Sequence, residues 1–304
     1  MAQLTLQHVK GNSYFCSGPM SIGVYVHENK AILIDSGGDE SCAKDVNKAL
    51  QAAGYHADAI INTHCHPDHC GGNAYFQKNF PHIKIYATHD EQPFIEDPLL
   101  APRCFCCLAA PFQGLQNKYL APQKSSTITN PIHPYKDHSI TINGIEFNIV
   151  TLPGHTPGQI GIITPDNILY CGDALFGEST IEKHPILFYT DIKKTLESFE
   201  KIKTLPVDGC VLVHGGIIYN IPTITKQHIA KIMETKDIIL DFLRSQPLSI
   251  DELTQKIMLK YSIGNNMVAF TLTQTTIRAY LSYLEQEKLV SLIVSEGLLR
   301  ALII

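Results

Sequence analysis

The sequence predicts a layered α/β domain followed by a small module of helices that ends in a β-hairpin. Up to about residue 222, apolar strand-like runs alternate with amphipathic helical segments. Beyond that point, three helical segments precede two short apolar runs that flank Glu296 and Gly297. We therefore expect a larger domain over residues 1–222 and a winged-helix-like α+β module over residues 223–304.

The first part of the larger domain combines a hairpin, two helices and two further strands. Residues 21–38 form a predicted hairpin: apolar side chains alternate in its first strand, Glu28-Asn29-Lys30 form the turn, and the second strand is a continuous apolar run that ends at Asp35. A helix is predicted over 41–54, with Gly54 as its C-terminal stop. The remaining predicted elements are a strand at 57–64, a helix at 71–80 and a strand at 83–89.

The segment from about residue 90 to 133 has no clean periodicity and is interrupted by prolines. Such a long irregular insertion in a compact domain is often a lid or a binding loop. A surface excursion without a role is the alternative.

Strand signals resume after the insertion. Residues 139–155 form a predicted hairpin with Asn143-Gly144 at its turn, and 159–173 form a second one. An amphipathic helix at 191–205 and a buried strand at 207–216 complete the larger domain.

The predicted helices of the C-terminal module cover 225–246, 249–263 and 273–290. The second of them opens with a Ser249/Glu252 capping-box spacing. From residue 223 to 304 the chain has nine Lys/Arg and eight Asp/Glu, a net charge of +1 (9 − 8). A helix that binds nucleic acid normally carries a clear cationic excess, so we expect this module to pack beside the functional site of the larger domain or to form a homodimer contact.

Composition argues against a disordered chain, a strongly basic nucleic-acid-binding protein and a membrane protein. The 304 residues are 44% hydrophobic and 17% charged, which is typical of a globular protein with a sizeable core. A net charge of −5 gives no basic footprint, and no signal peptide or membrane span is apparent, so we expect a cytoplasmic protein without membrane partners. The nine cysteines are expected to be reduced thiols. Cys104, Cys106 and Cys107 form a cluster that could bind a soft metal or simply pack in a loop.

The segment 62–72, NTHCHPDHCGG, concentrates metal-binding side chains. Imidazole and carboxylate ligands suit zinc, manganese or ferrous iron. One metal could not comfortably accept all four side chains of so short a loop, whereas two neighbouring metals could. His64 and His66 would then face one metal, and Asp68 and His69 the other.

Two metals require more ligands, and the chain offers three at strand ends. His155, Asp173 and His214 each follow an apolar run and lie beside glycine. A lone histidine would be weak evidence for a metal site, but the whole set of candidate ligands in this order is strong evidence.

This pattern resembles the metallo-β-lactamase superfamily over roughly residues 5 to 220. The resemblance implies a four-layer αβ/βα sandwich and a catalytic domain over 1–222. It would place His64, His66 and His155 on the first metal, Asp68, His69 and His214 on the second, and Asp173 between them. Asp35 would be a supporting residue behind the ligands.

The resemblance also implies a hydrolase that uses a metal-bridging hydroxide, with Asp68 orienting the water. We expect two divalent ions, Zn²⁺ by preference, with Mn²⁺ or Fe²⁺ as alternatives. The glyoxalase II-like branch predicts a small thioester, ester or lactone as substrate, and the residues that bind it are not identified. Phe176, Glu178 and Tyr219 are candidates only by their proximity to the ligands.

Three other interpretations stay open at this stage. A nuclease acting on RNA or single-stranded nucleic acid would use the C-terminal module to grip its substrate. A winged-helix regulator would use the metal domain as a sensor. A closed structural zinc site would hold the loop without catalysis, but seven candidate ligands for two metals leave positions open to water.

Overall fold

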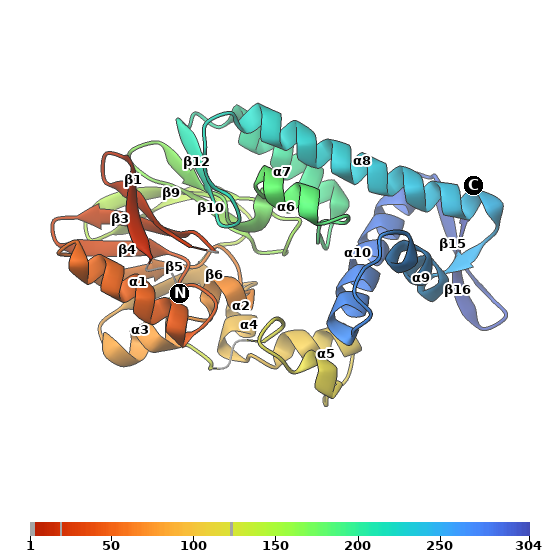
Figure 1. The fold of residues 1–304 in the computed structure, drawn as a ribbon, viewed down its shortest axis with the longest axis horizontal. Helices are drawn as coiled ribbons and strands as arrows, with labels where there is room; N and C mark the ends of the chain where they lie inside the picture. The colour runs from red at the N-terminus through yellow and green to blue at the C-terminus, as the bar shows by residue number, and fades with distance from the viewer. Residues whose placement is uncertain (1–3, 19, 122–123) are drawn as a thin grey trace.

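Two mixed β-sheets form the centre of the larger domain. We describe residues 4–18, 20–121 and 124–304 from a computed structural model (Figure 1). The first sheet has the order β1-β2-β3-β4-β5-β6-β7 and is antiparallel from β1 to β4 and parallel from β4 to β7. Its strands are β1 (Thr5–Lys10), β2 (Ser13–Ser17), β3 (Ile22–His27), β4 (Lys30–Ile34), β5 (His56–Ile61), β6 (Lys84–Thr88) and β7 (Asn130–Ile132).

The second sheet has the order β13-β12-β11-β10-β9-β8. All its neighbouring strands are antiparallel except the pair β11 and β12. Its strands are β8 (His138–Ile142), β9 (Ile145–Thr151), β10 (Ile160–Ile163), β11 (Ile168–Tyr170), β12 (Gly209–Leu212) and β13 (Gly216–Ile218). The predicted turn between β8 and β9 is confirmed, because Asn143 and Gly144 both have positive φ, as a two-residue hairpin requires.

The alternation of side chains along the strands produces four layers. Ile32 and Ile34 of β4 point into a core shared with Phe147 of the second sheet. Leu33, between them, points to the other face and packs with Val46 of α1 (Glu40–Ala52). The outer face of the second sheet is covered in turn by α7 (Ile192–Thr204) and α8 (Ile221–Ser245). The result is an αβ/βα sandwich with helices outside both sheets (Figure 1).

Short helices occupy several connections. They are α2 (Pro67–Cys70), α3 (Asn73–Asn79), η2 (Gly172–Ala174) and α6 (Glu178–Lys183). The first two lie next to each other after β5, where Gly71 passes so close to Gly38 that any side chain would overlap the Gly38 carbonyl.

The expectation that 90–133 is irregular is wrong in part. The segment contains α4 (Gln92–Glu96), α5 (Leu100–Cys106), η1 (Gln113–Leu115) and the edge strand β7. Pro93 and Pro102 interrupt the apolar pattern but fit into first helical turns, where a missing N–H costs little.

The C-terminal part contains three helices and a three-stranded antiparallel sheet of order β14-β16-β15. Its elements after α8 are β14 (Leu248–Ser249), α9 (Ile250–Lys260), α10 (Met267–Gln286), β15 (Val290–Ser295) and β16 (Leu298–Ile303). The predicted capping box of Ser249 and Glu252 is present. Helix α10 starts six residues before the predicted segment, because the Asn266 side chain accepts the Ala269 N–H and caps it.

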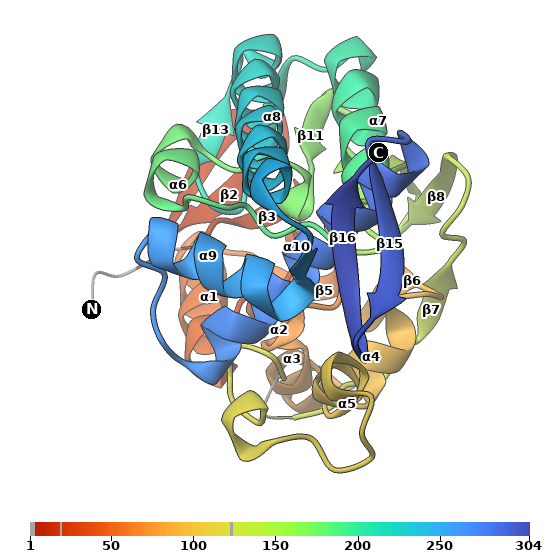
Figure 2. The same cartoon turned by 90° about the vertical axis from the view of Figure 1, so that its right-hand side faces the viewer.

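One helix connects the two parts of the chain. Helix α8 packs on α6 and α7 and also contacts β16, so that it extends from the second sheet of the sandwich to the C-terminal sheet (Figures 1 and 2). The apolar cluster beneath it includes residues on both sides of residue 222. Helix α10 also contacts η1 of the insertion. Within the described residues, every helix is too short or too polar to cross a membrane.

Candidate metal centre

The seven predicted ligands meet at one edge of the sandwich. Four come from the loop and short helix α2 that follow β5, where Pro67 at the first helical position fixes the turn between His66 and Asp68. The other three come from the chain after β9, β11 and β12. They fall into two groups whose side-chain donor atoms lie within 4.8 Å of one another: His64, His66 and His155, and Asp68, His69, Asp173 and His214.

In the first group, three ring nitrogens converge on one point. His66 Nδ1 lies 3.0 Å from His64 Nε2 and 2.8 Å from His155 Nε2. Ligands 2.0–2.1 Å from a tetrahedral zinc ion would be about 3.3 Å apart, so a small outward adjustment would admit a metal.

The second group contains buried polar atoms that lack protein partners. His69 Nε2 lies 3.3 Å from Asp173 Oδ1, and among the described residues neither atom has a hydrogen-bond partner. His214 Nε2 lies 3.3 Å from Asp68 Oδ2. Buried polar groups without partners are costly, so this group fits a cation that would satisfy them.

Asp173 lies between the two groups. Its Oδ1 is 3.3 Å from His69 Nε2, and its Oδ2 is 3.5 Å from His155 Nε2. One carboxylate oxygen therefore faces each group, which is the arrangement that a bridging ligand requires.

Hydrogen bonds behind the ligands orient the imidazoles. His69 Nδ1 donates to Asp35 Oδ2 at 2.7 Å, and the same carboxylate accepts the Thr63 N–H and hydroxyl at 2.8 Å each. His155 Nδ1 donates to the Phe188 carbonyl at 2.9 Å. In both histidines the hydrogen bond holds Nδ1, so Nε2 is the nitrogen that faces the centre and would bind a metal.

Electrostatics differ between the two groups. Burial lowers the pKa of His66 to about 3 and also lowers that of His155, which keeps these rings neutral as metal ligands must be. Burial also acts on Asp68 and Asp173, but the nearby His69 outweighs it and holds both carboxyl pKa values below their usual range. Two ionised carboxylates in one small group favour a divalent cation.

Glu91 belongs to the site although the sequence analysis missed it. Its side chain is buried; Oε2 accepts the Cys65 N–H at 2.9 Å, and Oε1 accepts the Gly158 N–H at 2.8 Å. It thus ties the loop of His64 and His66 to the loop of His155. The sequence feature that could have identified Glu91 is its position three residues after the apolar strand β6, because His155, Asp173 and His214 also follow apolar strands.

The cysteines near the motif pack rather than point to the ligands. Cys70 is buried and its thiol donates to the Cys65 carbonyl at 3.2 Å. Cys104 and Cys107 are exposed free thiols, and the Cys106 side chain lies outside the described residues.

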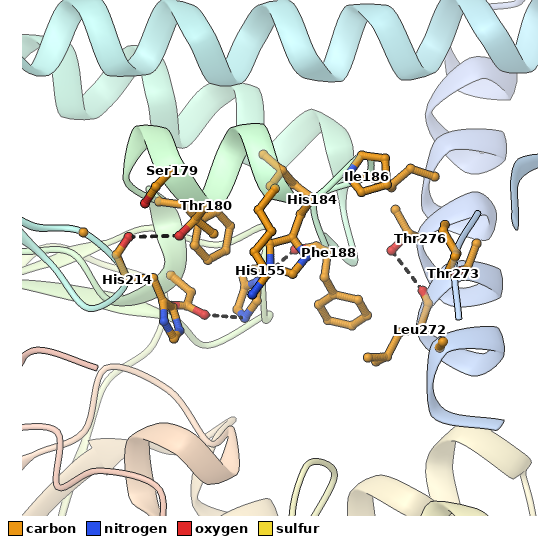
Figure 3. Close-up of a pocket in the computed structure, with 18 residues that line it drawn as sticks. His155, Ser179, Thr180, His184, Ile186, Phe188, His214, Leu272, Thr273 and Thr276 are labelled. Atoms are coloured by element: carbon orange, nitrogen blue, oxygen red, sulfur yellow. Dashed lines mark hydrogen bonds and ion pairs between the residues drawn. The ribbon is translucent and has the colours of Figure 1, made fainter. Parts of the chain in front are cut away.

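Two cavities open onto the ligands. One, of about 420 Å³, is lined by His66, Asp68 and residues of α4, α5 and their connections. The other, of about 580 Å³, is lined by His214, by the chain from Ser179 to Phe188 and by α10 (Figure 3). Of the three candidate pocket residues, Phe176 lines the second cavity. Glu178 and Tyr219 line neither: Glu178 accepts a hydrogen bond from Gln227, and Tyr219 is exposed.

Comparison with protein families matches residues 18–214 to the metallo-beta-lactamase superfamily. The chain is 25% identical over 184 residues to a hydroxyacylglutathione hydrolase from Enterobacter sp. strain 638, a match that covers 60% of this chain and 56% of that protein. The chain thus spans little more than half of this relative. A hydroxyacylglutathione hydrolase from Haemophilus influenzae is 24% identical over 194 residues, covering 64% of this chain and 82% of the relative.

Two crystal structures share the fold over nearly the whole chain. A metallo-beta-lactamase family protein from Thermus thermophilus has a TM-score of 0.73 at 19% identity, covering 94% of each chain. A beta-lactamase domain protein from Burkholderia ambifaria has a TM-score of 0.73 at 17% identity, covering 98% of this chain and 93% of the other. The likeness therefore includes the C-terminal helices and sheet.

Proposed function

The chain belongs to the metallo-β-lactamase superfamily of metal hydrolases, and from that premise we propose that it hydrolyses a small thioester, ester or lactone at a binuclear centre. The observation that carries this proposal is the placement of Asp173, with one carboxylate oxygen toward each histidine group and the two cavities meeting beside it. The similarity to hydroxyacylglutathione hydrolases supports the substrate class.

The residues of the site would hold two divalent ions, zinc by preference. His64, His66 and His155 would bind one, Asp68, His69 and His214 the other, and Asp173 both. When bound, such ions lower the pKa of water towards neutrality and polarise a carbonyl oxygen.

The chain's own groups have distinct parts in the reaction. In the hydrolysis, the acyl C–O or C–S bond breaks, the water oxygen joins the acyl carbon, and a water proton goes to the leaving alcohol or thiol. The Asp68 side chain is 39% exposed, whereas the His69 and Asp173 side chains are 0% and 7% exposed. Asp68 is thus a carboxylate of the centre that can reach a cavity, and we assign it to hold and orient the water proton.

The lining of the cavities favours a small molecule over a nucleic acid. Among the described residues that line either cavity, Lys183 is the one lysine or arginine. A nuclease would need several cations to meet the phosphates of its substrate. We propose that the C-terminal part, winged-helix-like in its order of helices and hairpin, serves here as a wall of the active site.

A paired assay tests the function. The metal-loaded protein would be given S-lactoylglutathione and a panel of esters and lactones, and in parallel labelled single-stranded RNA. We expect hydrolysis of a member of the panel that Asp68→Ala abolishes, and two metal ions per chain by elemental analysis. Cleavage of RNA alone, lost in Asp68→Ala, would overturn the proposal.

A further inference from the structure

The two cavities are arms of one active site. They share His155 and Asp173 at their base, and Phe188 and Leu272 also line both. Phe188 comes from the chain after α6, and Leu272 faces it from α10 (Figure 3). This apolar pair therefore stands between the arms above the metal centre, and a substrate whose scissile group lies at Asp173 would extend into both.

The 420 Å³ arm is apolar away from the metal centre. Aromatic and aliphatic side chains of the insertion line it: Phe94, Phe105, Tyr119 and Leu120. Beyond Asp68 and Asp173, Glu91 is the one carboxylate among the described residues that line it, and Glu91 already accepts two backbone N–H groups. This arm consequently offers contact area but few polar partners.

The 580 Å³ arm is more polar, although Ile186, Leu187 and Ile263 are also among its lining residues. Ser179, Thr180 and Lys183 line it from α6, and Thr273 and Thr276 face them from α10. The Thr180 and Thr276 hydroxyls donate to the backbone carbonyls of His214 and Leu272. Ser179 and the Lys183 ammonium group remain to meet a ligand, and Asp173 is the one carboxylate among the described lining residues, so this arm suits a polar and anionic group.

We propose that the substrate is an amphipathic ester or thioester. One substituent of its carbonyl is an apolar chain or ring that fills the insertion arm, and the other is polar and anionic and lies along α6 and α10. The proposal rests on the hydrolase function above and adds the substrate class. The volume of about 420 Å³ lies within the size range of small-molecule pockets, so this arm can hold a chain of medium length.

Two series of substrates test this directly with the metal-loaded, full-length protein. In the first, acyl chains of two to twelve carbons are joined to a small carboxylate-bearing thiol. In the second, alcohols of the same lengths are esterified to one carboxyl of succinate. We expect kcat/KM to rise at least tenfold between two and eight carbons in one of the two series.

A matched pair of variants locates the effect. Ala101 lines the apolar arm from α5, whereas Ala109 is exposed and lies outside both cavities. Ala101→Leu should lower the ratio of kcat/KM for eight carbons to that for two at least fivefold, and Ala109→Leu should leave this ratio unchanged.

The outcomes separate the two proposals. Hydrolysis that shows no dependence on chain length in either series overturns the amphipathic substrate and leaves the hydrolase function standing. Absence of hydrolysis across both series and the lactoylglutathione control overturns the hydrolase function together with this inference. The dependence of the wild-type kcat/KM on chain length tests the amphipathic substrate even if Ala101→Leu does not fold.

Discussion

His69 Nδ1 donates to Asp35 Oδ2 at 2.7 Å, a contact between residues 34 positions apart that sets the direction of a predicted metal ligand. Both side chains are buried, and Asp35 adopts the left-handed backbone conformation, with φ of 65°. This backbone conformation is strained for a residue other than glycine, and it persists only where surrounding contacts hold the residue in place. Here the Thr63 N–H and hydroxyl hold Asp35 in place by donating hydrogen bonds to its carboxylate.

Asp35→Asn should weaken metal binding without removing a ligand. The amide keeps the shape of the side chain but loses the charge that favours the Nδ1–H tautomer of His69, so we expect a 10- to 100-fold lower affinity for the metal. Competition with a chromogenic chelator measures this affinity.

The control for Asp35 is Asp45→Asn, a half-exposed position of α1 whose carboxylate pairs with Lys48. It should leave metal affinity unchanged. An Asp35→Asn protein that binds metal as tightly as the wild type would show that the contact does not orient His69.

Glu91→Gln should reduce turnover and stability together. A glutamine has one acceptor oxygen, so either the Cys65 or the Gly158 N–H would lose its partner, at a cost of about 1–3 kcal/mol in the free energy of unfolding. Because those N–H groups belong to the two loops of the first histidine group, kcat should fall more than KM changes. Urea denaturation and steady-state kinetics provide the two measurements.

Glu146→Gln, on an exposed position of β9, is the matched control for Glu91 and should alter neither quantity. Loss of stability in Glu91→Gln with an unchanged kcat would show that Glu91 stabilises the fold and does not contribute to turnover.

The histidine at position 228 makes stability depend on pH. Its Nδ1 donates to the Ile224 carbonyl at 2.8 Å, and its Nε2 accepts the Phe176 N–H at 2.9 Å, so the ring must be neutral. Burial lowers its pKa to about 4. The unfolded chain binds this proton near pH 6.5 and the folded chain near pH 4. The contribution is therefore complete above pH 6.5 and is lost as pH falls to 4, to a total of roughly 2–3 kcal/mol.

His228→Gln removes this titration and keeps an acceptor near the Phe176 N–H. Thermal unfolding of the metal-loaded protein between pH 4 and 6.5 should show a smaller loss of Tm on acidification than in the wild type. His82→Gln, at an exposed position, should retain the wild-type slope. Equal slopes in all three proteins would contradict the assignment.

Much of the fold could be predicted because strands and helices repeat apolar residues with their own periods. All seven predicted ligands lie after strands, and apolar runs followed by glycine mark such positions. The structure accordingly brings them into two groups. Gly71 of the motif lies against the Gly38 carbonyl, where any side chain would overlap.

Other features could not be predicted because they depend on tertiary contacts. Helices α4 and α5 are five and seven residues long, too short to show a periodic pattern. Glu91 has a role only because Cys65 and Gly158 meet in space. Leu272 reaches the active site because α10 contacts the insertion, a relationship between segments more than a hundred residues apart.

Metal removal should destabilise the folded protein. Without cations, His69 Nε2 and Asp173 Oδ1 are buried with no hydrogen-bond partner in the part of the chain that the structure describes, and two carboxylates share one small group. Zinc at 100 times its Kd should raise the free energy of unfolding by about 2.7 kcal/mol relative to the chelated protein. Calorimetry before and after treatment with a chelator measures the shift in Tm. His66→Ala, which removes a predicted ligand, should show a smaller shift, whereas His82→Ala should behave as the wild type. A zinc-independent Tm in the wild type would be incompatible with the proposed centre.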